Sequence, residues 1–357
     1  PEEPWCGLAE AGQRTDIRDA AALDLADPAG PPEPAALEAM AKEAEAAALE
    51  VEGVGQAEGA GASWSRRRID LAASNGFSGG YARTASSLFV SAIAGEGLGM
   101  ERDFRGESRR YAEELPDARG IGREAGERAV ARLNPKRPPT GAFPVLYHER
   151  GASGLIGHLI GAANGAAVAR GSSWLKERMG EQVLPKGLSV TEQPLRVRGP
   201  ASRPFDAEGL AARDTVFVED GVLRTWVLDL SAARQLGLES TANASRGPGG
   251  APSPSTTNLH LTPCEIGFDA LMARMGTGLL VTSLIGASIN GNTGDYSRGA
   301  SGFWVEGGEI AYPVNEITIA GNLHGMLASI VPANDADPNR GAVVPSLLVE
   351  GLTVAGG

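Results

Sequence analysis

Apolar residues recur at helical spacing in several separate parts of the chain. In residues 35–51, Leu37, Met40, Ala44 and Ala48 lie three or four positions apart among alanine and glutamate, which predicts an amphipathic helix. The same spacing predicts helices at residues 121–133, 154–169, 231–236 and 268–275, and a short amphipathic segment that begins at Asn322.

Between these helices, alternating apolar and polar residues broken by glycine predict paired strands. The dipeptides Asn75-Gly76 and Asp220-Gly221 are strong hairpin signals. A third hairpin joins residues 300–305 and 309–312 through two glycines. Further strands are predicted at residues 65–73, 88–93, 143–147, 278–283, 317–319 and 342–354. Because no strand–helix–strand repeat is visible, we predict an α+β fold with extensive antiparallel or mixed β-sheet and interspersed helices.

The predicted helix at residues 154–169 is unusual because it carries four glycines, at positions 154, 157, 161 and 165. These positions share one face, so another element can approach the helix backbone closely there. Each glycine costs about 1 kcal/mol of helix propensity relative to alanine. We therefore expect close packing within the chain, or a contact across a subunit interface, to compensate.

Length and charge narrow the class of protein. The 357 residues are enough for two domains, and we predict an N-terminal α/β part at residues 1–140 and a C-terminal β-rich core domain at 141–357. Residues 1–34 are acidic and proline-rich, so we predict that most of this segment is a surface linker. The net charge of −12 argues against nucleic-acid binding by bulk electrostatics. No stretch has the length and hydrophobicity of a membrane span, so we expect a cytoplasmic location without membrane contact.

A polar cluster, Asp295, Tyr296, Ser297 and Arg298, stands out between glycine-rich segments. We predict that these residues lie at a loop tip, where side chains reach a ligand, and Arg298 is suited to a carboxylate. The alternative is that Asp295 only caps the turn and Arg298 is a solvated charge. Residues 100–114 hold many charges as well, and form either a docking face or a solvated edge.

The sequence contains no complete zinc-protease motif. His148-Glu149 begins like one, but the next histidine is His158. Ten residues of helix correspond to about 15 Å of rise and roughly 80° of rotation, so one zinc ion cannot bind both on a continuous helix. His158 on a Gly/Ala/Leu helix is also typical of a packing residue. A set such as His148, Glu149 and His260, brought together by the fold, stays open.

Other candidate sites are weaker. Cys6 and Cys264 match no metal or disulfide spacing, and Cys264 has no histidine that would activate it. Residues 247–250 lack the lysine of a phosphate-binding loop. Asp206 and Glu208 are either paired carboxylates or part of a turn, because proline and glycine flank them.

Several long segments carry a family resemblance. They read TGDYSRGASGFWVEGGEIAYPVNEITIAGNL, GLIGHLIGA, SRPFDAEG, RQLGLEST and MGTGLLVTSLIG. On these segments the chain resembles the TldD/PmbA family (modulators of DNA gyrase, peptidase U62-like), and within it the PmbA branch, also called TldE. The resemblance implies a PmbA/TldD-like fold, and it implies that family members carry a further α/β segment upstream of Pro1.

The resemblance also bears on zinc. TldD-type members carry His-Glu-x-x-x-His on the helix that matches residues 153–158, followed by a cysteine ligand near the C-terminus. Here Ser153 and Gly154 occupy the first two positions, only His158 remains, and residues 331–334 offer no cysteine or histidine. The resemblance therefore implies a degenerate metal-site helix, no metal or catalytic residue in this chain, and zinc in a TldD-type partner.

Two functions follow from the resemblance. In the first, the chain is the PmbA/TldE-like subunit of a TldD–TldE-type cytoplasmic metalloprotease complex that acts on unfolded proteins, antitoxins or peptide precursors. Asp295, Tyr296, Ser297 and Arg298 then contact the substrate or the interface. In the second, the chain is a homo-oligomeric binding or regulatory protein without intrinsic catalysis.

Overall fold

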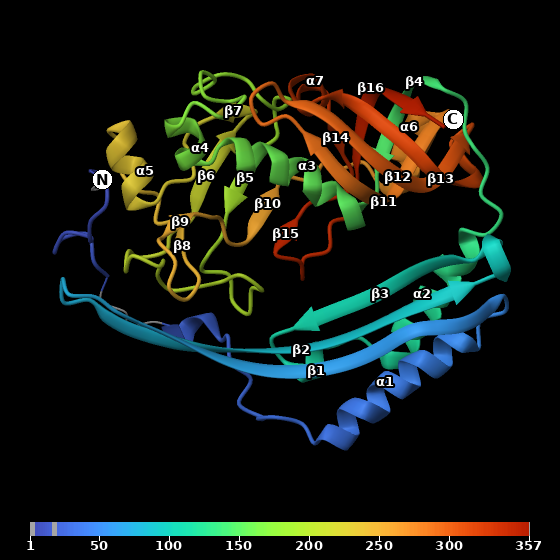
Figure 1. Cartoon of the computed structure of the whole chain (residues 1–357), viewed down its shortest axis with the longest axis horizontal. Helices are drawn as coiled ribbons and strands as arrows, with labels where there is room; N and C mark the ends of the chain where they lie inside the picture. Colours follow the sequence, from blue (N-terminus) through green and yellow to red (C-terminus); the bar gives the residue numbers. More distant parts are fainter. Residues whose placement is uncertain (1–3, 16–19, 357) are drawn as a thin grey trace. The chain divides into compact units, whose positions relative to one another are not determined.

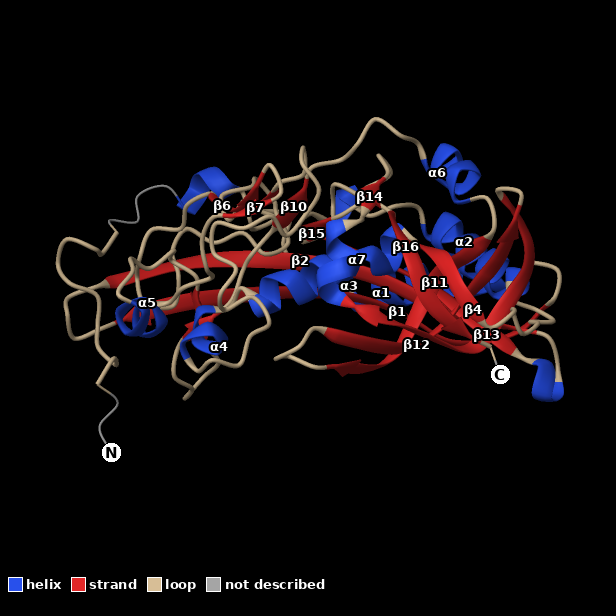
Figure 2. Ribbon diagram, turned by 90° about the horizontal axis from the view of Figure 1, so that it is seen from above, coloured by secondary structure: helices blue, strands red, loops and turns tan. Residues whose placement is uncertain are grey.

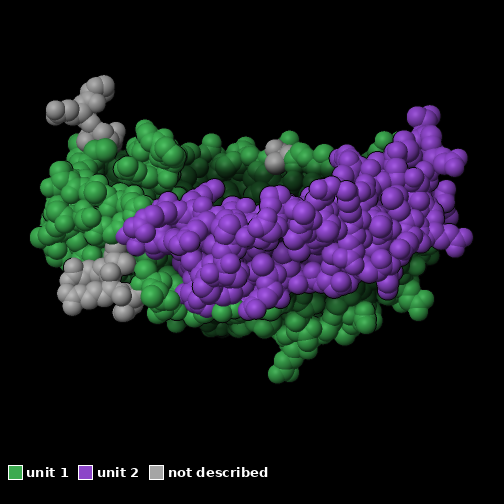
Figure 3. All heavy atoms as spheres, turned by 90° about the horizontal axis from the view of Figure 1, so that it is seen from below, with its two compact units in different colours: residues 1–23, 70–79, 137–357 green, residues 24–69, 80–136 purple. Residues whose placement is uncertain are grey.

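The computed structural model describes residues 4–15 and 20–356, and it divides into two compact units. Unit 1 contains Pro1–Leu23, Asp70–Gly79 and Arg137–Gly357, and unit 2 contains Asp24–Ile69 and Gly80–Lys136 (Figure 3). The predicted domain division at residue 140 stays a prediction. Among the described residues, no helix has both the length and the apolar character needed to cross a membrane.

Unit 2 is built from one sheet and two helices. The strands β1 (Val54–Ala72), β2 (Ser78–Ala94) and β3 (Glu101–Arg109) pair in that order, and α1 (Pro34–Leu49) and α2 (Ala118–Ala131) pack on one face (Figure 1). Small residues let the helices approach closely: a Cβ on Gly122 would lie 2.0 Å from the carbonyl oxygen of Ala44. The core therefore consists largely of alanines beneath Leu88 and Val90.

The main sheet of unit 1 has six strands. Their order is β13-β12-β11-β4-β16-β14, and β13 also pairs with β16. Five of the strands therefore form a closed ring without a free edge, and only the short β14 is appended. The strands are β4 (Gly141–Tyr147), β11 (Gly278–Ile289), β12 (Asp295–Glu306), β13 (Glu309–Asn322), β14 (Val331–Pro332) and β16 (Leu347–Ala355), seen together in Figure 2.

Helices cover this sheet on both sides. The helix α3 (Glu149–Ala162) places Leu155, Ile156 and Leu159 in one core with Tyr147 and Trp304. The helix α6 (Phe268–Met275) packs against the opposite face in a smaller core. The remaining α-helices of unit 1 are α4 (Gly165–Ala169), α5 (Leu230–Leu236) and α7 (Leu323–Ala328). Short 3-10 helices lie at Ala20–Leu23 in unit 1 and at Gly97–Gly99 and Ala112–Glu114 in unit 2.

A second sheet in unit 1 is made of short strands. Its order is β15-β10-β5-β6-β7, with Asp220 and Gly221 at the tight turn between β6 and β7. The strands are β5 (Val190–Glu192), β6 (Thr215–Glu219), β7 (Val222–Leu223), β10 (Leu259–Leu261) and β15 (Ala342–Val343), and a separate pair is formed by β8 (Ala244–Ser245) and β9 (Ser253–Pro254).

The structure confirms the predicted α+β class with mixed sheets, and it corrects two local predictions. The helix predicted at 154–169 is two helices, because the side chain of Asn164 caps a new one by accepting from the amides of Ala166 and Ala167. The second correction concerns Asp295–Glu306 and belongs to the candidate site. Within the segment predicted to be mostly a surface linker, Leu23 and Leu25 are buried, and residues 1–3 and 16–19 lie outside the described part.

Candidate functional site

The polar cluster that was predicted at a loop tip is the beginning of strand β12. Asp295 pairs with Asn322, and Tyr296 pairs with Gly321 on one side and with Ile289 on the other. The prediction of a loop is therefore wrong, because two neighbouring strands satisfy the backbone of these residues and override their turn-forming character. The turn itself lies just before, at residues 290–294.

Strand alternation places Tyr296 and Arg298 on one face of β12 and Ser297 on the other. Tyr296 is only 3% exposed and belongs to the core that α3 covers. Arg298 lies near it, half-buried, and its Nε donates to the carbonyl oxygen of Gly286 at 2.6 Å. Gly286 has a φ of 62° and lies where the register between β11 and β12 shifts, so a bulge provides the acceptor for Arg298.

The helix α3 brings His158 to the same place. Its imidazole packs edge-on against the ring of Tyr296, with ring centroids 5.9 Å apart. Behind this pair, the hydroxyl of Tyr147 donates to the hydroxyl of Tyr296 at 3.4 Å. Two residues from separate predictions, His158 and Tyr296, therefore lie in contact, together with Tyr147 at the end of β4.

The protonation states of this cluster follow from burial and from one cation. Burial lowers the pKa of His158, and the guanidinium of Arg298 lowers it further. Burial raises the pKa of Tyr147 well above its ordinary value, and it raises that of Tyr296 as well. At neutral pH the imidazole and both phenols are therefore uncharged, and Arg298 carries the charge of the cluster.

Asp295 has a structural position. Its carboxylate accepts from the hydroxyl of Thr293 at 2.6 Å and from the side-chain amide of Asn322 at 3.0 Å. These hydrogen bonds lower the pKa of Asp295. Asn322 in turn caps α7 by accepting from the amide of His324. Asp295 thus ties the turn at 290–294 to the beginning of α7, which fits the alternative in which it stabilises the turn.

The helix face around His158 does not have the donor set of a zinc ion. Ser153 lies more than one turn before His158, and Gly154, on the same face as His158, has no side chain to offer. A structural or catalytic zinc site needs at least three protein ligands. Residues 4–15 and 20–356 contain no group of three or more His, Cys, Asp or Glu side chains that could hold a metal. The fold does not bring His148, Glu149 and His260 into such a group either.

Of the two acidic residues in the predicted turn, Asp206 is buried and Glu208 is partly buried. Asp206 accepts from the amides of Glu208 and Leu210, and Gly209 has a φ of 83°, so the turn is confirmed. Glu208 accepts from the amide of Leu230 at the beginning of α5. Burial, with the nearby carboxylates of Asp206 and Asp229, raises the pKa of Glu208 to about 7. The sequence left two alternatives for Asp206 and Glu208, a pair of carboxylates or part of a turn. The structure shows a turn whose two carboxylates also lie close enough for one to raise the pKa of the other.

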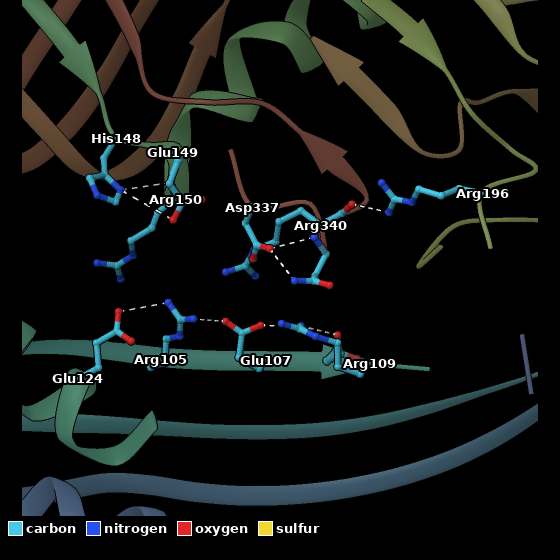
Figure 4. Close-up of polar contacts among 12 residues, drawn as sticks. Arg105, Glu107, Arg109, Glu124, His148, Glu149, Arg150, Arg196, Asp337 and Arg340 are labelled. Atoms are coloured by element: carbon cyan, nitrogen blue, oxygen red, sulfur yellow. Dashed lines mark hydrogen bonds and ion pairs between the residues drawn. The ribbon is translucent and has the colours of Figure 1, made fainter. Parts of the chain in front are cut away.

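The charged segment at 100–114 is neither a bare docking face nor a fully solvated edge. Along β3, Arg105 and Arg109 both bind Glu107, whose side chain is fully buried, and Arg105 also contacts Glu124 of α2 (Figure 4). The positions 105, 107 and 109 share one strand face, so alternation builds an ion-pair ladder within unit 2. A separate cluster in unit 1 joins Arg340 to Asp337 and to Arg196.

Comparisons with known proteins agree with this geometry. Two family models match, the PmbA/TldA metallopeptidase central domain at residues 27–133 and the C-terminal domain at residues 140–356. The chain belongs to this family. The metalloprotease PmbA of Escherichia coli O157:H7 is 38% identical over 356 residues, which is 99% of this chain and 76% of that protein. The PmbA homologue of Haemophilus influenzae is 38% identical over 284 residues, or 79% of this chain and 61% of that protein.

Solved structures give the same family fold. A candidate modulator of DNA gyrase from Bacteroides thetaiotaomicron has a TM-score of 0.89 at 28% identity, and the match covers 100% of this chain and 79% of that one. TldE from Thermococcus kodakarensis has a TM-score of 0.83 at 22% identity, over 100% of this chain and 81% of that one. This second likeness supports the PmbA/TldD-like fold alone.

Sequence reasoning missed Tyr147 and Gly286 as parts of the cluster. Tyr147 was predicted only as the end of a buried strand, although a hydroxyl at the end of an apolar strand is a usable signal for a polar contact. Gly286 gave no signal, because its role depends on a bulge between two strands.

Proposed function

We propose that this chain is the PmbA/TldE-type subunit of a cytoplasmic TldD–TldE-type metalloprotease complex, with zinc held by the TldD-type partner. The substrates of the complex are unfolded proteins, antitoxins or peptide precursors. One observation carries the proposal: the helix that holds zinc ligands in TldD-type members offers a single imidazole here, and a guanidinium lies beside it.

The charges near His158 support the placement of zinc in the partner and not in this chain. A divalent cation binds best where carboxylates, thiolates or neutral imidazoles surround it. Among the described residues, Arg298 is the charged side chain that lowers the pKa of His158, and its cation opposes both protonation of the ring and binding of a metal ion. The surface of α3 and β12 is therefore better suited to anionic or neutral peptide groups.

In this proposal the chain contributes walls to the substrate chamber and completes the site of its partner. The segment from Asp295 to Arg298 contacts substrate or interface. Asp295 and Asn322 hold the neighbouring turn in place, and Arg298 and Tyr296 provide the polar surface. Ser153, Gly154 and His158 form the degenerate metal-site helix.

The test is co-expression with a TldD-type chain. We expect zinc at one ion per TldD-type chain, digestion of an unfolded protein by the pair, and neither bound zinc nor digestion for this chain alone. Size-exclusion chromatography of each sample measures whether the two chains associate. A stable homo-oligomer that ignores the TldD-type chain would favour the regulatory alternative.

Zinc binding and digestion by this chain alone would contradict the proposal. If this chain alone binds stoichiometric zinc and digests the unfolded protein, and if His158→Ala abolishes both, the proposal is wrong.

A further inference from the structure

We propose that Arg298 and His158 form a binding site for the carboxylate group of a peptide, such as its C-terminus. The proposal deepens the function above, since it names the ligand chemistry of a surface that was assigned there to substrate or interface. It rests on contacts within unit 1 only.

The guanidinium of Arg298 is oriented before any ligand arrives. Its Nε donates to the carbonyl oxygen of Gly286 at 2.6 Å, which fixes one edge of the planar group. An arginine presents five N–H donors, and the two at the outer end of the guanidinium, one on each terminal nitrogen, are directed away from this anchor. A fixed guanidinium loses less conformational entropy on binding than a mobile one.

The charge of Arg298 has no counter-ion in the described part of unit 1. Other arginines of unit 1 do have such partners, for example Arg340 with Asp337 and Arg224 with Glu219. Asp295, three residues away, is engaged by Thr293 and Asn322 instead. Among the described residues no carboxylate forms an ion pair with Arg298, although the side chain is half-buried.

His158 adds a neutral N–H donor to the cation. The edge contact with Tyr296 holds the imidazole ring, and the hydroxyl of Tyr147 holds Tyr296 in turn. The two tyrosines therefore act as positioning residues, because they are buried and support the ring from behind. The low pKa keeps the ring uncharged in the absence of ligand, and a bound anion would raise it.

The glycines of α3 leave open space on the helix that carries His158. At Gly154, Gly157 and Gly161 of α3, a Cβ would meet no atom within 4 Å. The close packing that these glycines predicted is absent from the described part of the chain, except at Gly165, where a Cβ would lie 2.4 Å from Leu228. These glycines therefore leave room for a peptide end beside the backbone of α3.

A carboxylate fits better than a phosphate. The planar guanidinium matches the two oxygens of a carboxylate in a bidentate hydrogen-bonded pair. One cation and one neutral imidazole balance a single negative charge, whereas a phosphate near neutral pH carries between one and two.

The experiment titrates this chain with acetyl-trialanine while NMR records the imidazole Cε1–H signals. The chain has 4 histidines, so a His158→Gln variant assigns the signal. Trialanine amide, which lacks the charge, and inorganic phosphate are the comparison ligands. Arg298→Met removes the guanidinium, and Arg274→Met removes an exposed arginine on α6 as the matched control.

We expect acetyl-trialanine to shift the His158 signal saturably and to raise the pH midpoint of the ring. The amide should leave both unchanged. Arg298→Met should weaken binding at least about tenfold, and Arg274→Met should bind like the native chain. Equal binding of the amide, preference for phosphate, or no shift up to about 10 mM peptide would each overturn the proposal. The measurement needs no protease partner, so its outcome is independent of whether the complex digests protein.

Discussion

At the scale of single residues, the cluster around Arg298 is an electrostatic unit that can be tested without any ligand. Replacing Arg298 by methionine removes the cation that disfavours an imidazolium ion. We therefore expect the pKa of His158 to rise in Arg298→Met, while burial still holds it below its ordinary value. An NMR pH titration of the imidazole signal measures this, with Arg274→Met as the control. An unchanged pKa would show that the two side chains are not coupled.

Glu208 gives a second prediction at this scale, because its pKa is raised to about 7 in the folded chain against 4.5 ordinarily. A carboxyl group with a raised pKa binds more protons in the folded state, so its contribution to stability falls as pH rises through 4.5 to 7. Glu208→Gln removes this loss and still accepts from Leu230. We expect the variant to gain stability over the native chain at pH 8 but not at pH 4, as measured by urea unfolding.

The control for that experiment is Glu239→Gln, an exposed carboxylate near the end of α5. It should leave the pH dependence of unfolding unchanged. If Glu208→Gln showed the same flat difference at every pH, the burial of Glu208 would not have the energetic effect described.

At the scale of elements, some glycines face open space and others are packed against backbone, so replacing them by alanine should have opposite effects on stability. Gly157→Ala should raise the free energy of unfolding by up to about 1 kcal/mol, because the new methyl group enters open space and alanine favours the helix. Gly302→Ala in β12 should lower it by about 1–3 kcal/mol, because its Cβ would lie 1.9 Å from the carbonyl oxygen of Leu280. Urea unfolding of the two variants checks both signs. Destabilisation by Gly157→Ala would contradict an open face on α3.

Local signals explain which elements could be predicted from the sequence. The turn at Asn75-Gly76 and the helix at Phe268–Met275 follow from dipeptide and periodicity patterns, and both are present. The contact of His158 with Tyr296 could not be derived, because it depends on how a helix lies against a strand more than 130 positions away. The same holds for the pairing of Ile319 with Val354, which closes the ring of strands. The register between strands that are far apart in the chain cannot be read from the sequence pattern of either strand alone.

At the scale of the whole molecule, the net charge bears on whether this chain binds DNA. One relative is described as a candidate modulator of DNA gyrase, but the net charge of this chain is −12. Phosphate backbones require clustered cations, and each contact adds to the salt dependence of binding. The consecutive residues Arg66, Arg67 and Arg68 lie on β1, where neighbouring side chains point to opposite faces, so only Arg66 and Arg68 share a face and two cations make a small basic patch.

We therefore expect no complex with duplex DNA in a gel-shift assay at about 150 mM salt and protein up to roughly 100 µM, which spans the dissociation constants of about 1 to 100 µM that are usual for non-specific DNA binding. Repeating the assay at about 50 mM salt makes the test stricter, because weak phosphate contacts strengthen steeply as salt falls. A complex that forms at low salt and is lost in Arg66→Glu would locate a basic contact that the overall charge conceals. A complex that persists at the higher salt would contradict the electrostatic argument, since an acidic surface repels the backbone wherever cations are not concentrated.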